Sequence, residues 1–150
     1  MAKIKVQDKI TIFDNYKREP YHQFRIPGFW VTIDFLNDNP NVFFVFGDNL
    51  VHRGKGGAAS LRDLSNTIGF ITKKYPNNDI NSFFKPDEYY PIFNQECAKM
   101  CDLMSRYQNH YYLFSKLGAG LANKFCIFEK LIEPWLLSLE TKFVNCALLF

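Results

Sequence analysis

A glycine-rich stretch near the middle of the chain constrains the fold more than any other feature of the sequence. Residues 43–46 are a continuous apolar run, Gly47-Asp48-Asn49 follows it, and Gly54-Lys55-Gly56-Gly57 leads into small residues. This order predicts a buried strand, a loop and the start of a helix. Glycines let backbone amides approach a ligand, and the first turn of a helix has unpaired amides at the positive end of its dipole. The stretch therefore predicts a phosphate-binding turn, or else a glycine-rich turn that only connects strand to helix.

The familiar nucleotide-binding motifs do not fit this stretch. A Walker A loop would need Ser or Thr directly after its lysine, whereas Lys55 is followed by Gly56. The glycine spacing also differs from the GxGxxG pattern of dinucleotide-binding proteins. Other parts of the sequence are therefore needed to indicate which anion binds.

Length and charge narrow the possible classes of protein. The 150 residues suit a single domain with a sizeable core, and residues 1–25 form an amino-terminal extension to which the sequence assigns no role. Aromatic residues make up 17% of the chain, which is typical of a globular protein. The net charge is only +3 and the basic residues are scattered along the sequence. We therefore expect no direct nucleic-acid binding.

Membrane insertion and metal binding are also not expected. No apolar run approaches the roughly 20 residues that span a bilayer, and the amino terminus lacks the apolar stretch of a secretory signal. We expect a soluble, cytoplasmic protein, or one exported into another cell as an effector. Cys97 and Cys101 lie one helical turn apart but have no neighbouring pair of metal ligands, so they are interpreted as buried thiols. No cofactor is predicted.

Strand and helix patterns alternate along the chain. Strands are predicted over residues 9–13, 29–33, 42–46, 68–72, 111–115 and 142–149, and helices over residues 57–64 and 87–107. Residues 14–20 and 37–41 are predicted as turns. A further helix should follow an Asn123 cap, with Pro134 kinking or interrupting it. This alternation predicts an α/β sandwich with a mixed central sheet.

A second glycine loop strengthens the ligand hypothesis. Residues 116–122 read Lys-Leu-Gly-Ala-Gly-Leu-Ala and, like the first loop, follow a predicted buried strand and precede a helix. Ligands of α/β sheets bind outside the carboxyl ends of the strands. If the two strands are neighbours, residues 48–57 and 116–122 should line one cleft.

The two loops together resemble those of the macrodomain family, the α/β/α module that binds ADP-ribose. In that family a buried strand ends in an Asn-rich turn, continues through a glycine triplet into a helix, and is complemented by a second loop of Gly-Thr-Gly-hydrophobic type. Here Gly47-Asp48-Asn49, Gly54-Lys55-Gly56-Gly57 and Gly118-Ala119-Gly120-Leu121 stand at these places, although Lys55 interrupts the triplet. Asp34 precedes the turn by about the distance of the family's adenine-facing Asp. Small phage and bacterial proteins with a Phe-Gly-Asp-Asn strand end are similar.

The resemblance implies a three-layer α/β/α sandwich and an ADP-ribosylhydrolase that removes ADP-ribose from a modified protein side chain, with arginine as one candidate linkage. The implied partners are ADP-ribose and an ADP-ribosylated protein. The catalytic candidates are Asp48, Asn49 and Lys55. The ligand-binding candidates are Asp34, Arg53, Gly54, Gly56, Gly57, Ala58, Lys116, Gly118, Ala119, Gly120 and Leu121.

Hydrolysis of a glycosidic bond needs stabilisation of a cationic ribose and a deprotonated water. Asp48 is the first candidate for the base because it lies at the strand end, and capping of the loop backbone is its alternative role. His52 is an acid–base candidate from its ordinary pKa near neutrality, with a surface histidine as the alternative. Two other functions stay open: a reader that binds ADP-ribose without turnover, and an interaction protein that binds another nucleotide or a partner protein.

Overall fold

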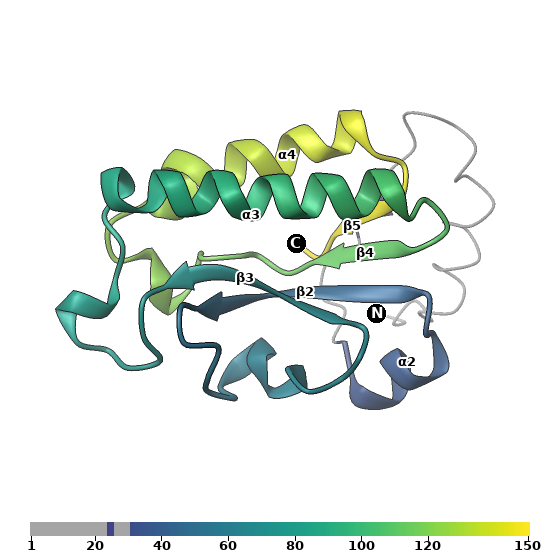
Figure 1. The fold of residues 1–150 in the computed structure, drawn as a ribbon, viewed down its shortest axis with the longest axis horizontal. Helices are drawn as coiled ribbons and strands as arrows, with labels where there is room; N and C mark the ends of the chain where they lie inside the picture. The colour runs from purple at the N-terminus through teal and green to yellow at the C-terminus, as the bar shows by residue number, and fades with distance from the viewer. Residues whose placement is uncertain (1–23, 26–30) are drawn as a thin grey trace, which may run out of the picture.

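The computed structural model describes residues 24–25 and 31–150, and its centre is a five-stranded sheet (Figure 1). The strand order is β1-β5-β4-β2-β3, and every hydrogen-bonded pair among these strands is parallel. The strands are β1 (Phe24–Arg25), β2 (Val42–Asn49), β3 (Thr67–Lys73), β4 (Tyr111–Phe114) and β5 (Cys146–Leu148). The α/β class predicted from the sequence is confirmed.

The prediction of a mixed sheet is wrong for the described strands. The antiparallel contact found in this part of the chain is an isolated bridge between Lys73 and Phe83, outside the strand pairs. Parallel neighbours need a crossover of a dozen or more residues, and the connections between β2, β3, β4 and β5 all supply that length. Because of this arrangement, β2, β3 and β4 all end at one edge of the sheet, which we call the carboxyl edge (left in Figure 1).

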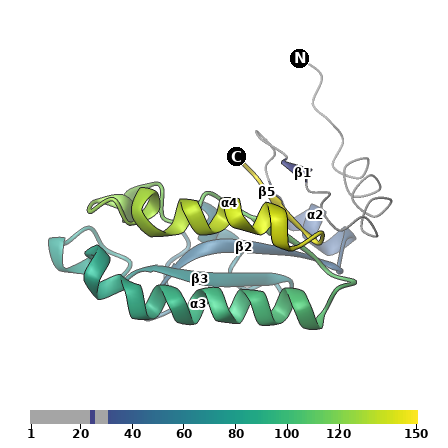
Figure 2. The ribbon, with the colours of Figure 1, turned by 90° about the horizontal axis from the view of Figure 1, so that it is seen from above.

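Helical elements cover both faces of the sheet (Figures 1 and 2). The helices α3 (Pro86–Arg106) and α4 (Glu133–Lys142) pack on one face, and α2 (Ile33–Asp38) with the 3-10 helix η1 (Gly57–Leu61) packs on the other. Along β4, Tyr112 and Phe114 belong to the first core, whereas Tyr111 and Leu113 belong to the second. Successive strand residues point to opposite faces, so a strand buried on both faces reads as a continuous apolar run.

The edge strand β3 is capped by side chains of α3. The Ile71 amide donates to Glu96 Oε1 at 2.7 Å, and the Ile71 carbonyl accepts from the Tyr89 hydroxyl at 2.5 Å. The Gly69 carbonyl accepts from Lys99 Nζ at 2.6 Å. Unpaired groups of an edge strand would otherwise be open to pairing with another chain, so α3 closes this edge as well as covering the sheet.

The strand predicted over residues 29–33 is wrong where the structure describes it. Phe29 and Trp30 lie outside the described residues, and Ile33 begins α2. The aromatic and β-branched residues favoured a strand, but Thr32 caps a helix: its hydroxyl oxygen accepts a hydrogen bond from the Phe35 amide at 3.1 Å. Burial of Phe35 and Leu36 against the sheet fixes the short helix in place.

The other predicted elements in the described part are found with modest shifts. The strands predicted over 42–46, 68–72 and 111–115 correspond to β2, β3 and β4, and the helix over 87–107 corresponds to α3. The closing strand is shorter than residues 142–149 because α4 continues to Lys142. Asn39 ends α2 within the predicted turn over 37–41. The strand predicted over residues 9–13 and the turn over 14–20 lie outside the described residues.

The interruption at Pro134 is confirmed, whereas the predicted cap at Asn123 is displaced: the helix has its N-cap at Ile127, and Asn123 ends the 3-10 turn η3 (Leu121–Asn123). Asn123 Oδ1 accepts from the Phe128 amide at 2.9 Å. The helix then runs as a π-helical segment, η4 (Phe128–Ile132), and becomes α-helical only at Glu133, next to Pro134. A proline cannot donate a backbone hydrogen bond, so the change of helix type falls where the α-helical pattern would be broken.

Candidate functional site

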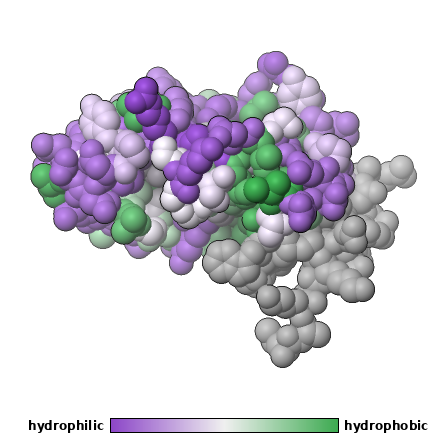
Figure 3. Space-filling model, turned by 90° about the horizontal axis from the view of Figure 1, so that it is seen from below, coloured by the Kyte–Doolittle hydropathy of each residue, from purple (hydrophilic) through white to green (hydrophobic). Residues whose placement is uncertain are grey.

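The two glycine loops leave neighbouring strands. We name residues 50–58, after β2, the first glycine loop, and residues 115–122, after β4, the second glycine loop. β2 and β4 pair in parallel from Val42 opposite Tyr111 to Val45 opposite Phe114. Both loops therefore emerge at the carboxyl edge, as the sequence predicted for neighbouring strands. Hydrophilic residues predominate at this end of the molecule in the view from below (left in Figure 3).

Thr72, near the end of β3, connects the two loops. Its hydroxyl donates to the Asp48 carbonyl at 3.3 Å. On the other side, Gly118 of the second glycine loop, with φ 76°, lies so close that a Cβ there would be 3.5 Å from the Thr72 methyl group and 2.7 Å from Ile132. Glycine is required at position 118 for both reasons. No local pattern in the sequence indicated this bridging position of Thr72.

The Asp48 carboxylate is buried, and each of its two oxygens has a partner. Oδ1 accepts from the Asn49 amide at 2.8 Å and pairs with the Arg62 guanidinium at 2.7 Å, while Oδ2 lies 2.8 Å from His52 Nδ1. The Asp48 side chain is only 3% exposed. Gly69 of β3 makes room for it, because a Cβ at that position would lie 2.4 Å from Oδ2.

Burial would raise the pKa of Asp48, but the partners reverse that effect. The His52 hydrogen bond, the Asn49 amide and the Arg62 guanidinium together hold the pKa below its ordinary value. A carboxylate with a lowered pKa and no free oxygen is a poor proton acceptor. The geometry therefore favours the loop-anchoring alternative for Asp48 over the predicted role of general base.

His52 contacts the buried Asp48 carboxylate and is itself exposed to solvent. Its side chain is 64% exposed, and its backbone adopts φ 53°, a left-handed conformation that few residues other than glycine occupy. With Nδ1 directed at Asp48, the described residues supply no hydrogen bond to Nε2. An imidazole that donates from Nδ1 carries its lone pair on Nε2. The contact with Asp48 therefore fixes the orientation of the imidazole ring.

Asn49 and Arg62 close the first glycine loop from inside. Asn49 Nδ2 donates to the Arg53 carbonyl at 2.7 Å, and Asn49 Oδ1 accepts from the amides of Val51 and Arg53. Arg62 donates to the Arg53 and Gly54 carbonyls at 3.1 and 3.0 Å. Both polar atoms of the Asn49 side chain are thus hydrogen-bonded within the loop. In this arrangement the side chain is not available to hydrogen-bond a ribose.

Both loops present unpaired backbone amides. Within the described part of the chain no acceptor bonds the amides of residues 54–58, nor those of Gly120, Leu121 and Ala122. The residues of the first group are exposed. Space is open beside Gly56, Gly57 and Gly120, where a Cβ would meet no atom within 4 Å. Successive exposed amides form a concavity suited to an anion.

The predicted helix after the first glycine loop is instead η1, a five-residue 3-10 helix. Its start has two unpaired amides but too few aligned peptides for an appreciable helix dipole. The anion-binding capacity of this loop therefore comes from its individual amides and not from a helix terminus. This corrects the physical argument made from the sequence, although the position of the loop is as predicted.

The basic residues predicted for the site differ in the contacts that they make. Lys55 Nζ pairs with Asp63 at 2.5 Å, with both side chains more than 60% exposed. Lys116 lies over the Phe128 ring, with its ammonium 5.4 Å from the ring centroid. Arg53 is exposed, and only its backbone contacts Asn49 and Arg62. Exposed ion pairs are weak, so Lys55 is free to exchange Asp63 for a ligand.

Asp34 does not join this site. It lies exposed in the first turn of α2, and α2 precedes the amino end of β2, at the opposite end of the sheet from the glycine loops (Figure 1). The adenine-facing role predicted for Asp34 is therefore not supported by its position. The error follows from the wrong strand over residues 29–33, which would have ended at the carboxyl edge.

Arg62 and Gly69 are site residues that the sequence analysis missed. A glycine inside a strand pattern often marks a close approach of another group, which was an available signal for Gly69. Arg62 had no comparable signal, because its three partners lie eight or more residues before it in the chain. Its guanidinium also lies over the Phe46 ring, 5.3 Å from the centroid.

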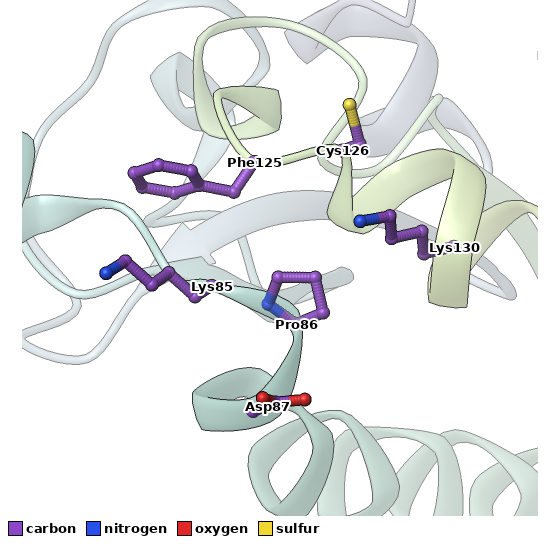
Figure 4. Close-up of a pocket in the computed structure, with 6 residues that line it drawn as sticks. All are labelled: Lys85, Pro86, Asp87, Phe125, Cys126 and Lys130. Atoms are coloured by element: carbon purple, nitrogen blue, oxygen red, sulfur yellow. The ribbon is translucent and has the colours of Figure 1, made fainter.

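Two hollows open beside the second glycine loop, and neither is lined by residues 48–57 or 116–122. One of them, between the start of α3 and Phe125, is drawn in Figure 4. Among the described residues no three His, Cys, Asp or Glu side chains gather as metal ligands would. None of the helices in this part of the chain has the length and apolar character needed to cross a membrane.

Comparison with known proteins gives one match. Residues 27–124, more than half of the chain, match a protein family described as a family of unknown function, DUF7831. No curated protein and no solved structure matches the chain. The matched range contains both glycine loops, Asp48, His52 and Arg62. The chain belongs to the family of unknown function DUF7831.

Proposed function

We propose that this protein binds ADP-ribose across the two glycine loops, with a macrodomain-like α/β/α arrangement, and hydrolyses the bond that joins ADP-ribose to a modified protein side chain. The observation that carries the proposal is the pair of neighbouring loops whose backbone amides have no acceptor among the described residues. A diphosphate has two anionic groups, and each loop offers amides to one of them.

The surroundings of the loops favour such a ligand. Arg53, Lys55 and Lys116 add positive charge beside the amides. The open space at Gly56 and Gly120 leaves a path for phosphate oxygens to reach the backbone. The internal bonds of Asp48, Asn49 and Arg62 hold the first glycine loop in shape before a ligand arrives, which reduces the entropy lost on binding.

His52 supplies the proton acceptor in this proposal. Water attacks the anomeric carbon of the ribose, its proton passes to His52 Nε2, and the bond to the protein side chain breaks with its electron pair. The leaving group takes a proton from solvent. Asp48 stays ionised, keeps Nδ1–H of His52 directed toward itself and stabilises the imidazolium that forms. An arginine-linked substrate is the first linkage to test.

The binding step is tested by isothermal titration calorimetry with ADP-ribose. Gly56→Val should weaken binding at least tenfold while leaving the fold intact, because the new side chain fills open space in front of the amides. Ala59→Val, half-buried in the 3-10 helix that directly follows Gly56, serves as the matched control. Absence of ADP-ribose binding by the wild-type protein would reject the proposal.

The hydrolytic step is tested by single-turnover release of labelled ADP-ribose from a modified protein. His52→Ala should slow release about a hundredfold or more without preventing ADP-ribose binding, as expected for loss of a general base. Binding without any release, even at high protein concentration, would identify a reader. Equal release by wild type and His52→Ala would remove His52 from the mechanism.

A further inference from the structure

Lysines that are scattered along the sequence gather at one place on the carboxyl edge. Lys73 and Lys74 come from the end of β3, Lys85 precedes α3, and Lys124 and Lys130 follow the second glycine loop. From the sequence alone, this scatter predicted that the protein has no basic face. Folding brings the three segments together. Lys74, Lys85 and Lys130 line two adjacent hollows, which we name the lysine groove, and Lys73 and Lys124 lie over Phe83 in its wall.

The lysine groove consists of two adjoining hollows. Its hollows have volumes of about 510 and 520 Å³ and share Lys85, Asp87 and Phe125 as a common wall. Lys130 lines one end, and Lys74 with Phe83 lines the other. Figure 4 shows Lys85 and Phe125 extending in the same direction, with the Lys130 ammonium directed toward the pocket from the opposite side. Two adjoining hollows offer room for neighbouring parts of an extended segment.

The charge in the groove is predominantly positive. Lys74 is paired with Glu88 at 2.6 Å. Lys73, Lys85, Lys124 and Lys130 have no ion pair with a described residue, and Asp87 is the remaining acid that lines the hollows. Two lining cations, Lys85 and Lys130, thus face one uncompensated carboxylate. Lys73 and Lys124 add positive charge over Phe83, so an anionic partner is favoured.

Aromatic rings accompany these lysines. Lys73 and Lys124 both lie over Phe83, with ammonium-to-centroid distances of 5.0 and 5.6 Å, and Lys85 lies 5.8 Å from the centroid of Phe125. Phe83 is buried, whereas Phe125 is half-buried and lines both hollows. A positive groove with an accessible aromatic ring is the combination that binds the backbone and bases of single strands.

We propose that the lysine groove binds single-stranded nucleic acid, with phosphates at Lys85 and Lys130 and a base stacked on Phe125. An acidic peptide would satisfy the charge but would leave the ring without a planar partner. This binding is independent of ADP-ribose hydrolysis, because the groove and the amides of the glycine loops are lined by different residues.

The test is fluorescence anisotropy of a labelled 20-nucleotide oligo(dT) between 50 and 200 mM salt. For single strands each phosphate contact contributes about 0.7 to the slope of log affinity against log salt, which is about fivefold per lysine at 0.1 M. Lys85→Ala/Lys130→Ala should therefore weaken binding about 25-fold and reduce the slope by about 1.4. The control Arg106→Ala/Lys142→Ala removes the same charge at the far ends of α3 and α4 and should leave affinity within about twofold.

Phe125→Leu should weaken binding about 5- to 150-fold, the range expected for loss of one base–aromatic stack. Tyr107→Leu, an exposed aromatic residue at the other end of α3, is its control. No binding at 50 mM salt, equal effects of groove and control variants, or equally strong competition by polyglutamate would each overturn the proposal. Far-UV circular dichroism and a thermal melt confirm that each variant is folded.

Discussion

Replacement of Asp48 by asparagine tests the central anchor of the first glycine loop. The carboxylate joins Arg62, His52 and the Asn49 amide, and its side chain is 3% exposed against 14% for Arg62. The Asp48→Asn variant keeps the size of the side chain but loses its charge, and it leaves the Arg62 guanidinium without its ion-pair partner.

The magnitude follows from the environment of the pair. Loss of one partner of a fully buried ion pair costs about 3–5 kcal/mol, and loss of a hydrogen bond to a charged group costs about 1.5–3 kcal/mol. Arg62 is partly exposed and the amide oxygen still accepts hydrogen bonds, so the lower range applies. We expect Asp48→Asn to reduce the free energy of unfolding by about 2–3 kcal/mol, which lowers Tm by about 4–12 °C.

The pH dependence gives a second signature of the same group. Because the pKa of Asp48 is lowered in the folded protein, the unfolded state takes up the proton first as the pH falls. Stability from this group is therefore fully present above its ordinary pKa of 3.8 and is lost as the pH falls through the lower folded value. The difference between wild type and Asp48→Asn should be constant from about pH 5 upward and should shrink below pH 4.

Urea unfolding followed by tryptophan fluorescence measures both effects, since Trp135 packs on Phe70, Phe93 and Phe114 in the core. Asp63→Asn is the matched control: the pKa of Asp63 is lowered by Lys55, but both side chains are exposed, so no measurable loss of stability is expected. A loss below about 1 kcal/mol for Asp48→Asn, or a difference that does not change with pH, would refute the reasoning.

Three further variants and one labelling experiment test other parts of the structure. Gly69→Ala should lower stability by about 1–3 kcal/mol in urea unfolding, because its Cβ would lie 2.4 Å from Asp48 Oδ2, whereas Gly56→Ala, with open space around it, should not. Asn66→Ala should cost about 2–3 kcal/mol in the same assay, since the buried Asn66 amide donates to the carbonyls of Leu36, Asn39 and Val42. Thiol titration should label exposed Cys126 first and leave Cys97, whose pKa is raised by burial, and buried Cys146 unreacted until the protein unfolds; early reaction of Cys97 would contradict the packing.

The sequence predicted those elements whose residues carry their own signal. Strands β2 and β4 are apolar on both faces, and α3 has apolar residues at helical spacing, so local pattern was sufficient. Residues 31–33 were misassigned because a single capping hydroxyl, on Thr32, outweighed the β-branched composition. The parallel direction of the strands depends on how the long connections cross the sheet, and a local residue pattern does not indicate this.

The same distinction holds for the candidate site: the position of the loops could be predicted locally, and the side-chain contacts could not. Glycine positions and the polar strand end located the two loops, because backbone freedom is encoded locally. The roles of side chains were harder to predict. Arg62 contacts Asp48 and Gly54, which lie well before it in the chain, and Lys124 and Lys73 lie over the same ring, that of Phe83. These contacts join distant segments of the chain and depend on the order of the strands. The position of Asp34 was wrong for the same reason.

Amide-resolved nuclear magnetic resonance during titration with ADP-ribose tests the proposed site most directly. The proposed function predicts that ADP-ribose shifts the backbone amides of residues 54–58 and of Gly120, Leu121 and Ala122 together, with one saturation curve for both loops. Shifts confined to one loop, or found elsewhere while both loops stay unchanged, would contradict the proposal that the two glycine loops hold one diphosphate.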